Sequence, residues 1–227
     1  MRYTFREQVA FGYGAMRALR NLGAALLIGT GAAQADTVVI AALGDSLTAG
    51  YGLPTADGFV PQLQDWLDAQ GIDAEVRNAG VSGDTTAGGL SRTDWTLTPE
   101  VDAMIVALGG NDYLRGLDPA VSRANLRGIL EKAQAAEVDV LLVGLVVGGN
   151  YGLDYKQDFE GMYADLSDEF DTSLFPSFFA GLQAAAGMQE GVAEFMQADG
   201  IHPNAEGVAV IVDAIGPAVE TLAEAAD

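Results

Sequence analysis

Runs of Val, Ile and Leu recur along the 227-residue chain, and segments with helical character separate them. Residues 37–43, 74–78, 103–108 and 138–147 form four clear runs, and residues 172–175 form a weaker fifth. The runs at residues 37–43, 103–108 and 138–147 are almost continuously apolar, which is typical of strands that are covered on both faces. Strands that alternate with helices form a parallel sheet between two helical layers. The sequence therefore predicts one domain of the α/β class.

Helices are expected between these runs and after the last one, at residues 60–70, 85–95, 119–136, 158–169, 177–189 and 205–225. The helix at 119–136 has the clearest start, because Asp118 suits the N-cap and Pro119 suits the first helical position. The spacing of its apolar residues predicts one buried face. These apolar residues are Val121, Leu126, Ile129 and Leu130.

Four loops follow the predicted strands directly, at residues 44–46, 80–84, 109–112 and 148–151. Parallel sheets form their binding sites beyond the carboxyl ends of the strands. We therefore expect these loops to share one rim of the sheet, where the candidate chemistry should be found.

The first 35 residues have the pattern of a secretory signal peptide. Four arginines precede a short apolar stretch at residues 22–28, and Ala33-Gln34-Ala35 matches a cleavage site. The stretch is shorter than the roughly 20 residues that span a bilayer, so a membrane anchor is the less favoured alternative. A start at Met16 would give a signal of ordinary length, with residues 1–15 an artefact of start-site choice. The mature domain is expected to be residues 36–227.

The composition excludes several kinds of catalytic site and binding partner. The chain has no cysteine and a single histidine, so disulfides and thiolate catalysis are excluded and a zinc site is not expected. Residues 36–227 carry 7 Lys and Arg against 31 Asp and Glu, a net charge of −24. This charge favours solubility and repels nucleic acid and anionic lipid surfaces. No nucleic-acid partner is predicted.

A serine and the only histidine are candidates for nucleophilic catalysis. Ser46 follows the first run, in Gly44-Asp45-Ser46-Leu47, and His202 lies in Asp199-Gly200-Ile201-His202-Pro203. A neutral imidazole can take the proton of a serine hydroxyl, and a carboxylate such as Asp199 can orient that imidazole. The alternative interpretation is a turn or N-cap serine, a surface histidine and a turn aspartate.

Two further loops offer hydrogen-bond donors for a developing oxyanion. Gly83 can present its backbone N–H at close approach, and Asn111, in Gly109-Gly110-Asn111-Asp112, can present a side-chain amide. The backbone N–H of Ser46 is a third candidate donor. Taken singly, each loop could also be an ordinary turn.

Together, these four segments resemble the SGNH, or GDSL, hydrolase family, whose serine, glycine, asparagine and histidine fall on Ser46, Gly83, Asn111 and His202. The chain looks closest to the bacterial arylesterase, thioesterase I and lysophospholipase branch. The resemblance implies a flavodoxin-like, three-layer α/β/α fold with a mostly parallel five-stranded sheet. It implies secreted or periplasmic hydrolysis of carboxylic esters without a cofactor, through an acyl-enzyme.

The resemblance also implies a substrate-binding role for Asn150 and Tyr151, because Asn150-Tyr151-Gly152 is similar to a segment of that branch. Residues 146–150 are richer in glycine than the corresponding stretch of the branch, which carries an arginine and a proline. This loop lies beside the acyl-binding groove in relatives, so no acyl-chain preference is carried over.

Two alternatives remain at this point. One is an enzyme of the same family that removes acetyl groups from carbohydrates, and the other is a non-catalytic secreted binding protein. The expected partner is a small-molecule or lipid ester. We expect no stable membrane anchor after removal of the signal, and a monomer.

Overall fold

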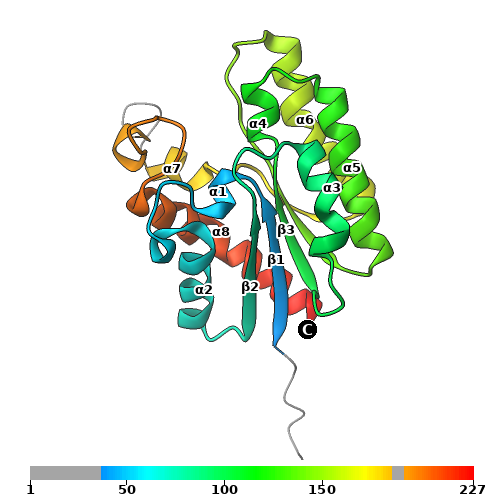
Figure 1. Ribbon diagram of the computed structural model, residues 1–227, viewed down its shortest axis with the longest axis vertical. Coiled ribbons are helices and arrows are strands. Elements are labelled where there is room, and N and C mark those ends of the chain that lie inside the picture. The colour runs from blue at the N-terminus through cyan, green and yellow to red at the C-terminus, as the bar shows by residue number, and fades with distance from the viewer. Residues whose placement is uncertain (1–36, 186–191) are drawn as a thin grey trace, which may run out of the picture. The chain divides into compact units, whose positions relative to one another are not determined.

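A five-stranded sheet organises the structure (Figure 1), a computed structural model that describes residues 37–185 and 192–227. The strand order is β2-β1-β3-β4-β5, and every neighbouring pair is parallel. The strands are β1 (Val38–Gly44), β2 (Ala74–Gly80), β3 (Ala103–Ala107), β4 (Asp139–Val143) and β5 (Ser173–Phe175). The parallel sheet and all five strands confirm the prediction from sequence.

The helices are α1 (Ser46–Ala49), α2 (Phe59–Gln70), α3 (Thr86–Thr96), α4 (Gly110–Leu114), α5 (Pro119–Ala135), α6 (Leu153–Phe170), α7 (Ala180–Ala185) and α8 (Ala205–Ala226). Two short 3₁₀ helices are η1 (Thr55–Asp57) and η2 (Val192–Phe195). No helix in the described ranges combines the length and apolar character that a membrane crossing requires. The predicted export signal, residues 1–35, and the end of the helix predicted over 177–189 lie outside the described residues.

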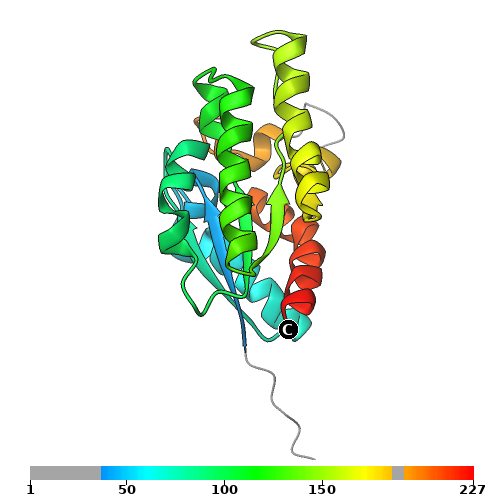
Figure 2. The same cartoon turned by 90° about the vertical axis from the view of Figure 1, so that its right-hand side faces the viewer.

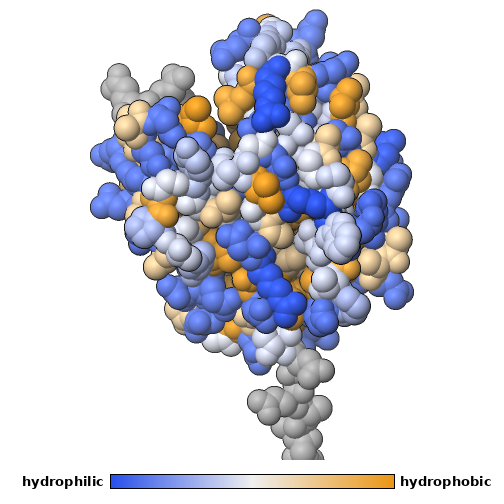
Figure 3. Space-filling model, in the orientation of Figure 1, coloured by the Kyte–Doolittle hydropathy of each residue, from blue (hydrophilic) through white to orange (hydrophobic). Residues whose placement is uncertain are grey.

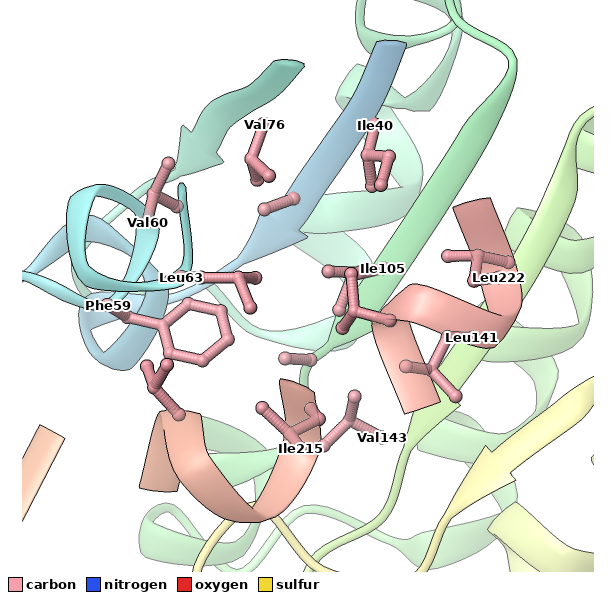
Figure 4. Close-up of a cluster of buried hydrophobic side chains, with 14 of the residues drawn as sticks. Ile40, Phe59, Val60, Leu63, Val76, Ile105, Leu141, Val143, Ile215 and Leu222 are labelled. Atoms are coloured by element: carbon pink, nitrogen blue, oxygen red, sulfur yellow. The ribbon is translucent and has the colours of Figure 1, made fainter. Parts of the chain in front are cut away.

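Helices cover both faces of the sheet (Figures 1 and 2). On one face, α2, α7 and α8 pack against alternate residues of the strands. Figure 4 shows Phe59 and Leu63 of α2 and Ile215 of α8 gathered around Ile105 of β3. Complete burial of a large aliphatic side chain contributes about 1.5–3 kcal/mol, so this layer is a major source of stability.

The opposite face is covered by α3, α5 and α6. Leu43 and Val106 of the sheet pack there against Leu126 and Ile129 of α5 and Phe159 of α6. All seven residues of β1 are buried, because both faces of this strand are covered. The continuous apolar runs of the sequence are thus explained by the two helical layers.

Helix α5 begins as predicted, since the Asp118 side chain accepts a hydrogen bond from the N–H of Ala120 and Pro119 is the first helical residue. The predicted buried face is wrong at one position, because Val121 is half exposed. Ser122 takes the inward position instead, where its hydroxyl donates to the buried carboxylate of Asp112.

Two boundaries also differ from the sequence prediction. The fourth strand ends at Val143 and does not extend to residue 147, because its neighbour β5 has three residues and the last pair joins Val143 to Phe175. Helix α6 begins at Leu153, five residues earlier than expected. Leu153 is 73% exposed, so the first turn of α6 lacks the buried apolar residues from which helices are recognised in a sequence.

Candidate active site

The strand order brings the sequence-predicted loops to one rim. The chain passes from β1 outward to β2 and then returns to β3 on the other side of β1. Such a reversal is the switch point at which open α/β sheets bind ligands, beyond the carboxyl ends of the strands. Ser46 follows β1 directly, and Asn111 is the second residue of α4, shortly after β3.

Ser46, His202 and Asp199 form a continuous hydrogen-bonded chain. The Ser46 Oγ lies 2.8 Å from His202 Nε2, although 156 residues separate the two in sequence. His202 Nδ1 lies 2.7 Å from the Asp199 Oδ2. A carboxylate at Nδ1 favours the tautomer with its proton on that nitrogen, so Nε2 is left to accept the serine proton.

Asp199 is held in place by its own loop. Its second carboxylate oxygen accepts the backbone N–H groups of Ile201 at 2.9 Å and of His202 at 3.0 Å. The hydrogen bond from the His202 ring, together with these two backbone donors, lowers the pKa of Asp199 to about 2. The carboxylate is therefore ionised at neutral pH, as a partner for an imidazolium must be.

The loop that carries His202 is tied to the segment after α1 by Gln197, a residue that the sequence interpretation missed. The Gln197 side-chain amide donates to the carbonyls of Tyr51 and Pro203, and its backbone N–H donates to the carbonyl of His202. The ring of Tyr51 lies 4.6 Å from the His202 ring, centroid to centroid. These contacts fix the imidazole from two sides.

Gly83 and Asn111 lie beside Ser46 in the wall of one pocket. Gly83 has a φ of 87°, a left-handed conformation that a residue with a side chain adopts only under strain. Asn111 Nδ2 donates to the Asp45 Oδ2 at 3.3 Å, which orients the amide next to the candidate nucleophile. The structure therefore places all three sequence-predicted donors at the same pocket.

Asp45 is a buried carboxyl between Ser46 and Asn111, with 3% of its surface exposed. Its other oxygen accepts the N–H of Leu47 at 3.0 Å. Burial raises the pKa of Asp45 to about 6, and the hydrogen bonds from Leu47 and Asn111 only partly oppose this increase. No pattern in the sequence marks Asp45 as buried.

Arg92 of α3 is a second residue without a predicted role. Its guanidinium donates to the carbonyl of Gly44 at 2.7 Å, to the carbonyl of Ala79 at 2.5 Å and to the carboxylate of Asp84 at 2.6 Å. It thereby joins the ends of β1 and β2 to the residue after Gly83. The sequence offers one indication that Arg92 has a role: it is one of few basic residues in a strongly acidic chain.

Asp112 connects the Asn111 turn to two helices. Its fully buried carboxylate accepts the backbone N–H of Thr86 at 2.8 Å, the Thr86 hydroxyl at 2.5 Å and the Ser122 hydroxyl at 2.9 Å. Thr86 begins α3, three residues after Gly83. The two loops with candidate donors are thus fixed relative to each other through one side chain.

The pocket at this rim has a volume of about 340 Å³, and in Figure 3 a hollow opens between the side chains over α7 and those over α4. Asn150 and Tyr151, which the resemblance implied as substrate-binding residues, do not line it; Tyr151 packs against Tyr113 and the backbone of Gly116. Apart from Ser46, Gly83, Asn111 and His202, the lining is largely apolar: Leu47, Tyr51, Tyr113, Leu114, Leu145, Val146, Val147, Phe179 and Ile201.

A metal site does not emerge from the residues that the structure describes, since no three His, Asp or Glu side chains in them converge on a position suitable for an ion. The polar groups of the pocket are a hydroxyl, an imidazole, an amide and carboxylates. These groups suit proton transfer and oxyanion binding.

Comparisons with known proteins identify the family of the chain. The sequence model of the GDSL-like Lipase/Acylhydrolase family matches residues 42–210. The chain is 40% identical over 209 residues to Esterase TesA of Pseudomonas aeruginosa, which covers 91% of this chain and 100% of that protein. It is 36% identical to Thioesterase 1/protease 1/lysophospholipase L1 of Escherichia coli K12, over 84% of this chain and 86% of that protein.

A solved structure extends the likeness to three dimensions. The psychrotrophic esterase EstA from Pseudoalteromonas sp., in a structure inhibited by monoethylphosphonate, superposes with a TM-score of 0.73 and 33% identity. The match covers 81% of this chain and 97% of that one. The chain belongs to the GDSL-like lipase/acylhydrolase family and is an enzyme that hydrolyses ester bonds.

Proposed function

We propose that Ser46 is the nucleophile of this ester hydrolase, with His202 as its general base and Asp199 as the residue that orients the imidazole. The observation that carries the proposal is the unbroken hydrogen-bonded chain from the Ser46 Oγ through both ring nitrogens of His202 to Asp199. No other histidine exists in the chain to serve as an alternative base.

The reaction has two acyl-transfer steps. His202 Nε2 takes the Ser46 proton while the hydroxyl oxygen attacks the ester carbonyl, and the imidazolium then protonates the leaving alcohol. The oxyanion is held by the backbone N–H groups of Ser46 and Gly83 and by the amide of Asn111. Water, deprotonated by the same imidazole, then attacks the acyl-enzyme and releases the acid.

The substrates we propose are carboxylic esters with an apolar acyl group, including aryl esters, lysophospholipids and thioesters. The apolar lining near Leu145, Val146 and Phe179 supports this choice, because such a wall stabilises hydrocarbon and offers few partners to a sugar. A panel of esters and thioesters of increasing acyl length, together with acetylated sugar polymers, tests it. Preferential deacetylation of the polymers would favour the carbohydrate esterase instead.

The roles of Ser46 and His202 predict that Ser46→Ala and His202→Ala each reduce hydrolysis of 4-nitrophenyl butyrate by on the order of ten-thousandfold or more. Labelling by a fluorophosphonate probe should disappear in Ser46→Ala. Ser82→Ala is the matched control, because Ser82 lines the same pocket but has no hydrogen bond to the imidazole. Retained labelling in Ser46→Ala, or turnover near that of the wild type in either variant, would refute the assignment.

We further propose that residues 1–35 are an export signal and that residues 36–227 act as a monomer in the periplasm or outside the cell. The arginines and the Ala33-Gln34-Ala35 segment support this proposal. N-terminal sequencing of the mature protein should begin at Asp36, and sedimentation should give the mass of one chain. A mature protein that retains the first 35 residues would contradict the export model.

A further inference from the structure

Cations are scarce in the described residues, and six of the seven lie within 4 Å of a carboxylate. The pairs are Arg77–Glu75, Arg92–Asp84, Arg123–Asp165, Arg127–Glu169, Lys132–Asp94 and Lys156–Glu160. Within residues 37–185 and 192–227, Arg115 is the cation without such a partner. Because carboxylates outnumber cations more than fourfold in residues 36–227, a cation that lacks one is an exception.

Arg115 lies beside two residues that line the active-site pocket, Leu114 and Gly83. It is the C-cap of α4, next to Leu114, which lines the pocket. The side chain is exposed, and its Nη2 donates to the carbonyl of Gly83 at 2.8 Å. The guanidinium is therefore bound to the carbonyl of Gly83, the residue whose N–H is a proposed oxyanion donor. This is the one hydrogen bond that its side chain makes among the described residues, and an arginine has five N–H donors.

An accessible guanidinium in this position is suited to bind an anion. Arginine binds carboxylate, phosphate and sulfate groups with two parallel hydrogen bonds. The net charge of −24 on residues 36–227 repels anionic substrates at long range, so a productive complex with one needs a local cation near the reacting bond. The nearby carboxylate of Asp84 is already bound by Arg92 and does not neutralise Arg115.

We propose that Arg115 binds an anionic group, such as a carboxylate, phosphate or sulfate, on the alcohol portion of the ester substrate. This inference rests on the proposed function of the pocket. The alcohol portion is the relevant one because the apolar wall near Leu145, Val146 and Phe179 accommodates the acyl chain and offers an anion no partner. The enzyme then selects amphiphilic esters with an apolar acid and a negatively charged alcohol.

The same contact could instead serve only to hold the Gly83 loop. That role would change the hydrolysis of all esters by the same factor, since the oxyanion forms identically in each. Anion binding changes the ratio between charged and neutral esters. The ratio of kcat/KM for a matched pair of substrates therefore separates the two roles.

The test uses the whole exported domain with 4-nitrophenyl butyrate and 3-carboxy-4-nitrophenyl butyrate, which share an acyl group and differ by one carboxylate on the alcohol. Arg115→Gln should lower the charged-to-neutral ratio of kcat/KM by about tenfold, mainly through KM, because one charge-assisted contact is lost. Arg115→Lys should lower it less, because the charge remains. Salt should raise the ratio in Arg115→Gln, because it screens the long-range repulsion, and should raise it less in the wild type, where it also weakens the contact with Arg115.

Lys132→Gln is the matched control, since it removes one positive charge from an exposed ion pair between α5 and α3. Its ratio should equal that of the wild type. An unchanged ratio in Arg115→Gln, or an equal fall in Lys132→Gln, would overturn the inference. So would a selective fall with an anion on the acid side, tested with 4-nitrophenyl hydrogen glutarate against 4-nitrophenyl pentanoate. Wild-type hydrolysis of the neutral ester tests the proposed function separately, and its absence would refute both.

Discussion

Asp45 illustrates how a single side chain serves the site at a cost in stability. Its carboxylate orients the amide of Asn111 and accepts the N–H of Leu47, but burial disfavours the charged form and raises its pKa to about 6. The folded chain therefore binds this proton more tightly than the unfolded chain, whose carboxyl has an ordinary pKa near 3.8. The contribution of Asp45 to stability is largest below about pH 4 and is lost as the pH rises through about 6.

Asp45→Asn removes this titration. The free energy of unfolding of the variant, relative to that of the wild type, should rise between about pH 4 and about pH 7.5 by on the order of 3 kcal/mol. His202 and Asp112, the other charged groups that act on Asp45, are present in both proteins. Urea unfolding at each pH measures the difference, and Asp65→Asn on α2 controls for the loss of one exposed charge. A pH-independent difference would contradict the assigned burial cost.

At the scale of elements, α3 connects the two parts of the candidate oxyanion site. Arg92 in this helix binds the carbonyl that precedes Asp45 and Ser46, and it also binds Asp84, which follows Gly83. Four-fifths of its side chain is buried, so the contacts are weakly screened by solvent. The guanidinium thus sets the distance between the backbone N–H groups proposed to hold the oxyanion.

Arg92→Gln should lower stability by roughly 3 kcal/mol, because Asp84 and two carbonyls lose their partner. It should also lower kcat for 4-nitrophenyl butyrate by about tenfold or more while KM changes little, since the misplaced donors act mainly in the transition state. Arg123→Gln, which breaks an exposed ion pair between α5 and α6, is the comparison variant. A kcat equal to that of the wild type in a folded Arg92→Gln protein would exclude this positioning role.

The elements with strong local signals could be predicted from the sequence, and those defined by tertiary contacts could not. The apolar runs indicated all five strands, and Asp118 with Pro119 marked the start of α5. The short helices α1 and α4 were missed because each has one turn and no apolar periodicity. The end of β4 depends on how far β5 extends beside it, which no local pattern records.

In the candidate site too, residues in local motifs could be predicted from the sequence, and residues that act through tertiary contacts could not. Ser46, Gly83, Asn111, Asp199 and His202 lie in short motifs that follow predicted strands or precede a predicted helix. The contacts that support them come from residues far away in the chain: the Gln197 amide reaches the carbonyl of Tyr51 across 146 positions. Such contacts follow from the packing of loops on the sheet, and single-sequence patterns carry no information about them.

At the scale of the whole molecule, the excess of negative charge destabilises the folded state. Residues 36–227 carry a net charge of −24, and the exposed ion pairs add little stability because solvent screens them. Repulsion among the remaining carboxylates acts over many pairs and is screened by salt. Stability should therefore depend on ionic strength.

The thermal unfolding midpoint of residues 36–227 should rise by several degrees between about 0.02 M and about 0.5 M NaCl, because screening weakens the repulsion more than it weakens the exposed pairs. Differential scanning calorimetry measures the change, and an equal ionic strength of another monovalent salt separates screening from specific ion binding. A midpoint that falls with salt would show that the ion pairs outweigh the repulsion.

Ser46 and His202 are 156 positions apart in the sequence, and this separation determines when a folding chain becomes active. Strands β2 to β5 lie between them, so the hydroxyl meets its base only when the entire sheet has assembled. A chain that is still being synthesised carries an ordinary, unreactive serine. Under the proposed mechanism, hydrolytic competence is delayed until folding is complete, without any inhibitor or propeptide to enforce the delay.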